Sequence, residues 1–381
     1  MRMKKSLLIL FFTFWALFFA AFRPAMPFAE EAAAPPEGAP VTGGRILMGT
    51  IGEPSNLIPY MASDSASSEI TGLLYVAPLK YDKDLNVVPW AAASYEVLDG
   101  GRLLRFVLRD DIRWEDGAPL TADDVEFTYR LMIDPKTPTA YSGDFLAIES
   151  FRKTGRLSFE VRYAKPFARS LMTWMGAILP KHVLEGQDIM TSPAARKPIG
   201  AGPYRLAKWD AGSMLTLTAS DTYFEGRPNL DEVVYRIIPD PSTMFLELKA
   251  GKLDMMSLSP QQYLRQTQGP QWERDWRKYR YLSFSYTFLG FNLQHPFFKD
   301  VRVRRAISMA IDRQSLIDGV LLGQGVPTVG PYKPGTWAYN DKLTPVQQDV
   351  DEARRLLAEA GWKKDQSALV FSTAWTDFEL T

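Results

Sequence analysis

Two adjacent carboxylates offer the clearest possibility of catalysis in this sequence of 381 residues. Glu115 and Asp116 follow directly on Trp114, and glycosidases use a pair of carboxyl groups to hydrolyse the bond between two sugars. The pair precedes Gly117 in a segment with the composition of a turn, however, and turn carboxylates usually face solvent. An exported glycosidase is therefore the weaker of the functions that we consider.

The sequence offers little support for a metal site or for nucleophilic catalysis. The chain contains two histidines, His182 and His295, far apart and without any cysteine, whereas zinc sites need several such ligands together. The acidic pairs at 110–111 and 123–124 could bind a hard cation, but they suit a solvated turn and a helix start better. We expect no catalytic residue, no metal and no cofactor.

Binding chemistry is better represented. Residues 279–292 are predicted to form one long strand rich in aromatic side chains. Aromatic rings in a cleft wall would give broad apolar contact, and exposed strand backbone can pair with an extended peptide whatever its sequence. A core strand with mixed faces explains the run equally well. The aromatic residues are Tyr279, Tyr281, Phe284, Tyr286, Phe288 and Phe291.

The clearest structural signal lies at residues 106–130. Phe106 and Leu108 alternate with polar or outward positions, as in a half-buried strand. A turn follows, and Thr121 is then a good N-cap with Asp124 three residues later, close to a capping box. The segment is therefore predicted to be a strand, a tight loop and a capped helix.

The rest of the chain alternates strand and helix signals, with 27 prolines and 26 glycines marking many turns. This pattern favours an α/β fold over a helical bundle. Strands are predicted at 45–50, 103–108, 157–163, 215–218, 233–238, 254–256 and 369–373, and helices at 67–74, 243–250, 301–317 and 351–360.

The N-terminus has the pattern of an export signal. Residues 1–5 carry positive charge and residues 7–21 are almost wholly apolar, so 1–29 is predicted to be a signal peptide that is cleaved after Ala29. An uncleaved anchor is the alternative, although about 15 apolar residues are short for a membrane span of roughly 20. Residues 30–44 are predicted to be a disordered lead-in. Without a cysteine, the protein is not expected to be a lipoprotein.

Composition excludes further classes. The 44 basic residues balance 44 acidic ones, and removal of the four basic residues of the leader leaves 40 against 44, about −4 in net charge. A nucleic-acid-binding protein would need a concentrated basic surface, so no nucleic-acid partner is expected. The apolar content of 46% is sufficient for two or three domains with ordinary cores.

Several motifs together resemble one family, the family 5 solute-binding proteins of bacterial ABC importers, which bind oligopeptides and dipeptides. The resemblance covers about residues 43–375, in order. Besides 106–130, it rests on the Glu-Pro loop at 53–59 that ends in Leu-Ile-Pro, Gly-Ala-Gly-Pro-Tyr at 200–204, Phe-Lys-Asp-Val-Arg-Val-Arg-Arg-Ala at 298–306, and the Ala-Gly-Trp helix end at 360–362.

This resemblance implies a two-lobed periplasmic-binding-protein fold of type II, with an extra subdomain in the first lobe. Lobe I is expected at 45–285, with the inserted subdomain at about 75–185, and an incomplete lobe II at 286–381, because the family continues well beyond this point. A binding protein of this kind closes its lobes over the ligand without covalent chemistry.

The resemblance also implies a function. The protein is expected to be a periplasmic monomer that delivers peptides to the permease subunits of an ABC importer. Nickel chelates and oligosaccharides are alternative ligands within the family, and a membrane-tethered receptor fragment is an alternative outside it. By analogy, the ligand-binding residues are expected to be Glu53, Ser55, Asn56, Tyr141, Gly202, Tyr286, Phe288 and Gly290.

Overall fold

The computed structural model describes residues 40–336, 338–362, 369–372 and 377–380. They form two compact units that divide between Leu258 and Ser259. The predicted signal peptide at 1–29 and most of the predicted lead-in lie outside the described residues. Within these ranges, no helix has the length and apolarity that crossing a membrane requires. The predicted boundary between lobes at residue 285 stays a prediction.

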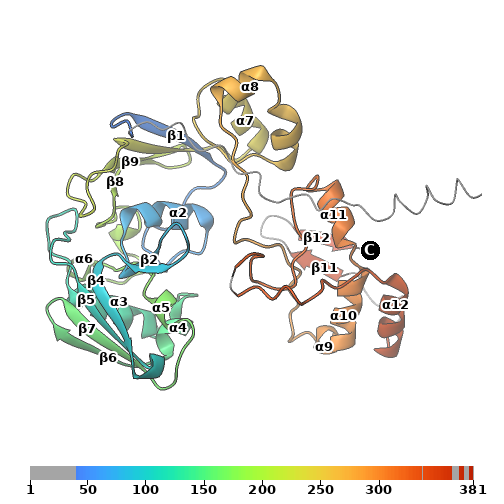
Figure 1. Ribbon diagram of the computed structural model, residues 1–381, viewed down its shortest axis with the longest axis horizontal. Helices are drawn as coiled ribbons and strands as arrows, with labels where there is room; N and C mark the ends of the chain where they lie inside the picture. The colour runs from blue at the N-terminus through green and yellow to red at the C-terminus, as the bar shows by residue number, and fades with distance from the viewer. Residues whose placement is uncertain (1–39, 337, 363–368, 373–376, 381) are drawn as a thin grey trace, which may run out of the picture. The chain divides into compact units, whose positions relative to one another are not determined.

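The first unit contains two four-stranded sheets (Figure 1). In one, β1 pairs parallel with β10 and the other pairs are antiparallel. Alternate residues of its third strand, Leu215, Leu217 and Ala219, are buried. A helix packs closely on β1, because a Cβ on Gly49 would lie 2.8 Å from the Met244 side chain. In order, the strands are β1 (Arg45–Thr50), β10 (Glu232–Ile237), β9 (Met214–Ala219) and β8 (Tyr204–Asp210), and the helix is α7 (Pro241–Lys249).

The second sheet is wholly antiparallel. One face is apolar, with the rings of Phe106 and Phe159 stacked 4.7 Å apart. On the other face Arg105 bridges Glu96 at 2.9 Å and Glu160 at 3.0 Å, which suits a surface in water. In order, its strands are β4 (Ala92–Leu98), β5 (Leu103–Leu108), β7 (Ser158–Tyr163) and β6 (Ile148–Gly155).

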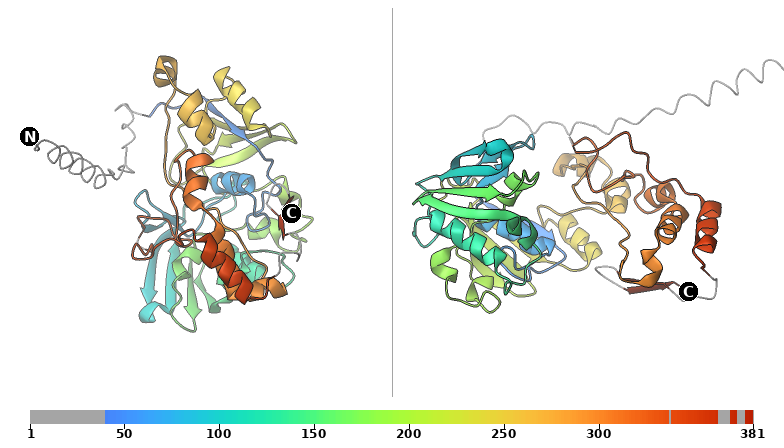
Figure 2. Two further views of the ribbon diagram at one scale, coloured as in Figure 1. Left: turned by 90° about the vertical axis from the view of Figure 1, so that its right-hand side faces the viewer. Right: turned by 90° about the horizontal axis from the view of Figure 1, so that it is seen from below.

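Helix α3 (Ala122–Ile133) covers the apolar face of this sheet (Figure 2). Tyr129 of the helix stacks on Phe151 of β6 at 5.2 Å. The helix begins with the predicted capping box, in which Asp124 accepts a hydrogen bond from the backbone N–H of Thr121 at 2.8 Å. The strand, turn and capped helix predicted from 106–130 are confirmed.

The remaining elements of the first unit are short. They are α2 (Ser65–Leu74), β2 (Leu79–Tyr81), β3 (Val87–Pro89), a 3-10 turn (Asp99–Gly101), α4 (Ser142–Leu146), α5 (Ser170–Thr173), α6 (Lys181–Leu184) and a second 3-10 turn (Pro193–Ala195).

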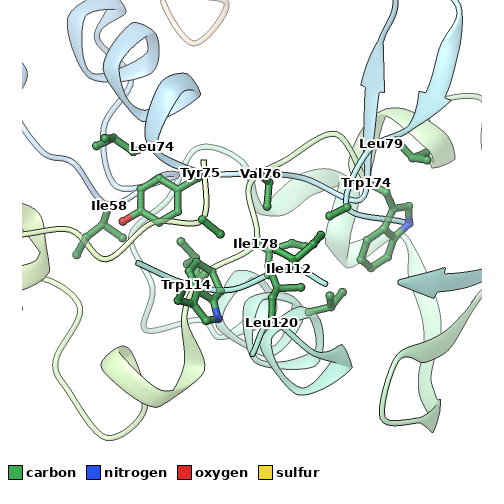
Figure 3. Packing of buried hydrophobic residues seen from close by; sticks show 14 of the residues in the cluster. Ile58, Leu74, Tyr75, Val76, Leu79, Ile112, Trp114, Leu120, Trp174 and Ile178 are labelled. Carbon is green, nitrogen blue, oxygen red and sulfur yellow. The ribbon is translucent and has the colours of Figure 1, made fainter. Parts of the chain in front are cut away.

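A single apolar cluster connects both sheets of the first unit. Within it Tyr75, Val76 and Trp114 lie close to Ile112 and Ile178, contributed by three separate segments (Figure 3). The first unit is therefore one compact body with a shared core.

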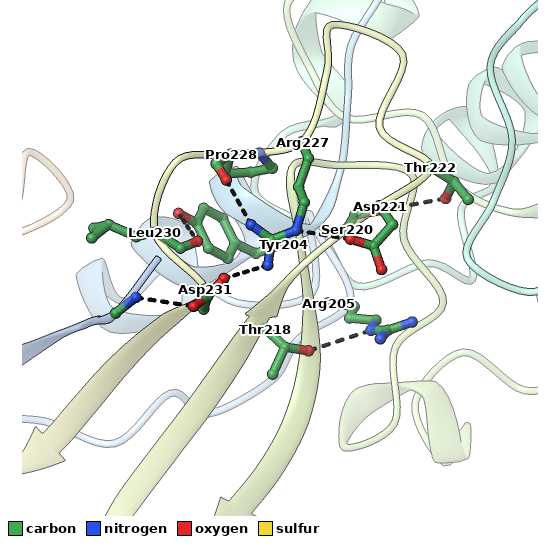
Figure 4. Close-up of polar contacts among 11 residues, drawn as sticks. Tyr204, Arg205, Thr218, Ser220, Asp221, Thr222, Arg227, Pro228, Leu230 and Asp231 are labelled. Carbon is green, nitrogen blue, oxygen red and sulfur yellow. Dashed lines mark hydrogen bonds and ion pairs between the residues drawn. The ribbon is translucent and has the colours of Figure 1, made fainter. Parts of the chain in front are cut away.

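Ion pairs and hydrogen bonds hold the loop between β9 and β10 in place (Figure 4). Arg227 pairs with Asp221 at 2.8 Å and with Asp231 at 2.5 Å. Asp231 also accepts a hydrogen bond from the Gly44 N–H at 2.9 Å. The same carboxylate therefore holds the start of β1 beside the start of β10.

Among the described residues of the second unit, most of the regular elements are helices. Val303 and Ala306 of α10 are buried with Ala353 of α12, and Arg302 donates to the Glu359 carbonyl at 2.8 Å. Its elements are a π-helical turn (Gln262–Gln266), α8 (Pro270–Asp275), α9 (Pro296–Lys299), α10 (Val301–Ala310), α11 (Arg313–Gly319), α12 (Val350–Glu359), β11 (Leu369–Ser372) and β12 (Asp377–Leu380).

Three predicted elements need correction. The strand predicted at 279–292 is wrong: the segment has no regular secondary structure, because a strand needs a neighbour and none of the described residues pairs with it. The single helix predicted at 301–317 is two helices, because Asp312 accepts a hydrogen bond from the Ser315 N–H at 2.9 Å and caps a new one. The strand predicted at 254–256 is only an isolated bridge between Met255 and Met48.

Candidate functional site

A pocket of about 320 Å³ opens in the first unit. Its wall combines the loop after Asn56, one side of α2 and three aromatic rings from elsewhere in the unit. The lining residues are Asn56, Ile58, Pro59, Tyr60, Ala62, Ser67, Ser68, Thr71, Gly72, Tyr75, Val76, Ala77, Trp90, Tyr141, Met175, Gly176 and Ala177. The volume is at the lower end of the range for small-molecule sites, about 300–1,000 Å³.

The loop at the pocket edge is held by the start of α2. Asp64 caps the helix by accepting from the Ser67 N–H at 2.7 Å, and it accepts from the Ser55 hydroxyl at 2.6 Å. The Ser67 hydroxyl in turn accepts from the Ser55 N–H at 3.0 Å. Burial raises the pKa of Asp64, but these hydrogen bonds outweigh it and hold the pKa below its usual value. The carboxylate is therefore charged at neutral pH and orders the loop.

Tyr60 forms a fixed aromatic wall. It has a φ of 72°, a strained conformation for a residue other than glycine. Its hydroxyl donates to the Ala177 carbonyl at 2.8 Å, and its own carbonyl accepts from the Thr139 hydroxyl at 2.8 Å. The ring meets Tyr141 edge-on at 6.0 Å. A Cβ at Gly176 would lie 2.2 Å from the Tyr60 hydroxyl, so a side chain there would displace the Tyr60 ring.

Trp90 is held from outside the pocket. Its indole N–H donates to the Tyr223 hydroxyl at 2.9 Å and lies 3.2 Å from the Glu225 carboxylate. Tyr223 donates to Glu225 at 2.6 Å, and Lys80 pairs with the same carboxylate at 2.7 Å. Lys80 also lies 5.3 Å from the centre of the indole ring. The network fixes the ring and balances the charge of the Glu225 carboxylate.

The pocket is uncharged. Its lining offers hydroxyl groups, one side-chain amide, aromatic rings and short apolar groups, with no acidic or basic side chain among them. Such a surface can bind through stacking, apolar contact and a few hydrogen bonds. It contains neither a nucleophile with an adjacent base nor a pair of carboxylates.

Two of the predicted ligand-binding residues, Asn56 and Tyr141, line this pocket. Ser55 lies beside it, with its hydroxyl engaged by Asp64. Glu53 faces the first sheet: its carboxylate accepts from the Trp209 indole at 2.7 Å and from the Gly212 N–H at 3.1 Å.

Gly202 has a packing role. It donates its N–H to the Leu74 carbonyl at 2.8 Å, and a Cβ there would lie 2.4 Å from the Leu73 carbonyl oxygen. The close approach anchors the turn before β8 to the C-terminal end of α2, on which the pocket depends.

The remaining predicted residues belong to the second unit. Tyr286 and Phe288 are 46% and 71% exposed, with their rings 5.4 Å apart, and Gly290 follows them. Their contact with a ligand stays a prediction.

Sequence reasoning missed Tyr60, Gly72, Tyr75 and Trp90 as pocket residues. A signal was present in the predicted helix at 67–74. Ser68, Thr71, Gly72 and Tyr75 follow the i, i+3, i+4, i+7 spacing that places residues along one side of a helix. The small and polar residues on that side of the helix, Ser68, Thr71 and Gly72, leave space for a pocket beside it.

The carboxylates considered for catalysis lie elsewhere. Asp116 pairs with His182 at 2.7 Å and accepts from the Ala118 N–H at 3.0 Å. Burial raises the pKa of Glu115 to about 7. Neither carboxylate lines the pocket. Across the described ranges, no group of three or more His, Cys, Asp or Glu side chains is placed to hold a metal ion.

Comparisons with known proteins identify the family of this chain. Residues 86–379 match the family model described as bacterial extracellular solute-binding proteins, family 5 Middle. The oligopeptide-binding protein AppA of Bacillus subtilis is 33% identical over 334 residues, which cover 86% of this chain. The match covers 61% of AppA, so the chain spans about three fifths of the length of that relative.

Solved structures show the same fold. The structure of B. subtilis AppA in complex with a nonapeptide has a TM-score of 0.77 and 30% identity, over 89% of this chain and 68% of that one. NikZ from Campylobacter jejuni in complex with Ni(L-His) has a TM-score of 0.74 and 27% identity, over 84% and 64%. The predicted α/β fold of the two-lobed periplasmic binding proteins is confirmed. The chain belongs to the bacterial extracellular solute-binding proteins of family 5.

Proposed function

We propose that this chain binds peptides in the periplasm and delivers them to the permease subunits of an ABC importer. The observation that carries the proposal is the preformed, uncharged, aromatic pocket of the first unit. A pocket of this kind suits a solute that is held and released unchanged. The peptide complex of the similar B. subtilis protein supports peptides as the solute.

In this proposal the ligand lies between two lobes, at 45–285 and 286–381, and Glu53, Ser55, Asn56, Tyr141, Gly202, Tyr286, Phe288 and Gly290 contribute to its site. The protein acts as a monomer, without catalysis or a cofactor. Its signal peptide at 1–29 directs export, and residues 30–44 precede the folded part.

Titration calorimetry with short peptides tests this proposal. Tyr141 is 42% exposed at the pocket, and its ring contacts Tyr60. Replacing it by alanine removes aromatic contact area from the ligand site, so Tyr141→Ala should weaken peptide binding by about tenfold or more. Tyr81→Ala is the matched control, because Tyr81 is 45% exposed but does not line the pocket. Equal losses in both variants would contradict a role for the pocket.

A nickel chelate is the second candidate ligand, because NikZ, whose structure contains Ni(L-His), has a similar fold. The pocket has no histidine of its own, so the chelating groups would have to come with the metal. Heat on titration with nickel and L-histidine together, but with neither alone, would favour this candidate over peptides.

A further inference from the structure

Gly72 stands in the interior of α2, on the side that lines the pocket. Glycine destabilises a helix interior relative to alanine, because it has more backbone freedom to lose on folding. A glycine is nevertheless required where φ is positive or where another group approaches too closely for a Cβ. Neither reason holds here: Gly72 has no positive φ, and a Cβ built on it meets no atom within 4 Å.

Other glycines of the unit show the contrast. A Cβ would lie 2.0 Å from the Leu74 carbonyl oxygen at Gly200 and 2.2 Å from the Tyr60 hydroxyl at Gly176. Packing explains both of those glycines. At Gly72 the absent side chain leaves space beside the pocket instead.

We propose that Gly72 is a specificity-determining residue, which keeps the pocket wide enough for one bulky, uncharged side chain of a bound peptide. This inference rests on the peptide-binding function proposed above. A side chain at position 72 would point from α2 into space that the ligand otherwise occupies.

The chemistry of the wall identifies the kind of side chain. Tyr60, Tyr75, Trp90 and Tyr141 present rings, and the other lining groups are hydroxyls, the Asn56 amide and apolar chains. Two carboxylates close to lining residues already have partners: Glu225 binds Lys80, and Asp64 caps α2. A charged ligand group would lose water here without gaining a partner. An aromatic or large aliphatic side chain fits this surface instead.

The test uses the purified chain and alanine-based hexapeptides that carry a single Phe, Lys or Asp at each position in turn. Calorimetry should find at least one position at which Phe binds about tenfold or more tightly than Lys or Asp. Gly72→Leu should reduce that Phe preference by about tenfold or more, because the added side chain fills the space. Gly72→Ala should have a smaller effect in the same direction.

Two controls separate specificity from folding. Ser65→Leu places the same side chain on α2 at an exposed residue that does not line the pocket, and its peptide preference should match that of the unaltered chain. Gly72→Ala should melt at the same or a higher temperature than the unaltered chain, because alanine favours a helix.

The outcomes are distinguishable. A Phe preference that persists in Gly72→Leu would overturn the role of Gly72. Tighter binding of the Lys or Asp peptides at every position would overturn the proposal that the pocket takes an uncharged side chain. Failure of the unaltered, folded chain to bind any peptide would overturn the proposed function together with this inference.

Discussion

At the residue scale, the pocket depends on side chains that do not line it. Tyr223 and Glu225 hold the Trp90 indole through its N–H, and Lys80 balances the charge of Glu225. An aromatic ring that is already ordered loses little further freedom when a ligand binds, so the network preorganises the site. The polar groups are thereby kept outside a pocket whose surface is uncharged.

Glu115 makes stability depend on pH. Burial raises its pKa from 4.5 to about 7 in the folded chain. Between these pH values the folded chain keeps a proton that the unfolded chain has released, so unfolding releases a proton and stability falls as pH rises. Glu115→Gln should remove this contribution. The free energy of unfolding of the variant, relative to the unaltered chain, should therefore increase from pH 4.5 to pH 7.

Urea denaturation at several pH values measures this difference. Glu149→Gln serves as the control, because Glu149 is an exposed glutamate on β6. If the difference in free energy of unfolding between Glu115→Gln and the unaltered chain stays constant from pH 4.5 to pH 7, burial does not raise the pKa of Glu115.

Part of the pocket could be predicted at this scale. Asn56 and Tyr141, which the family resemblance implies for ligand binding, both line the pocket, and their contact with a ligand stays a prediction. Tyr60 could not be found in the same way. Its position depends on a left-handed backbone and on a hydroxyl that reaches Ala177, 117 residues away, and neither leaves a local pattern in the sequence.

At the element scale, the turn before β8 supports the pocket through α2. Gly202→Ala would place a Cβ 2.4 Å from the Leu73 carbonyl oxygen, and the hydrogen bond from Gly202 to Leu74 would have to move. We expect a loss of about 2 kcal/mol or more in the free energy of unfolding, because such overpacking cannot relax without shifting backbone.

Chemical denaturation of Gly202→Ala beside Gly143→Ala tests this expectation. Gly143 lies in α4 without a positive φ, and a Cβ there meets nothing within 4 Å. Its variant should be as stable as the unaltered chain or more so. Stability of Gly202→Ala equal to that of Gly143→Ala would contradict the packing role.

The elements that could be predicted are those with local signals. Alternation and a capping box predict β5 and α3, and both form where expected. The segment 279–292 has strand composition but no partner among the described residues, and pairing is a property of the fold rather than of the segment. Asp312 divides the predicted helix at 301–317, because its side chain competes with the helix for backbone N–H groups.

At the scale of the whole molecule, the order of several motifs along the chain carries more information than any one of them. The resemblance noted from these motifs is confirmed by the family match over residues 86–379 and by the fold of the similar solved structures. The fold and the family can therefore be predicted from the order of the motifs. The ligand cannot be predicted from them, because the pocket wall is built from segments as far apart as Asn56 and Ala177.

We propose above all that the chain binds peptides and releases them without chemical change. Native mass spectrometry of the protein purified from a periplasmic extract tests it most directly. If the protein binds peptides, part of the sample is heavier than the polypeptide by the masses of peptides, which separate intact when the protein is unfolded. A folded protein that carries no peptide, and acquires none when a peptide mixture is added, would contradict the proposal that the chain binds peptides.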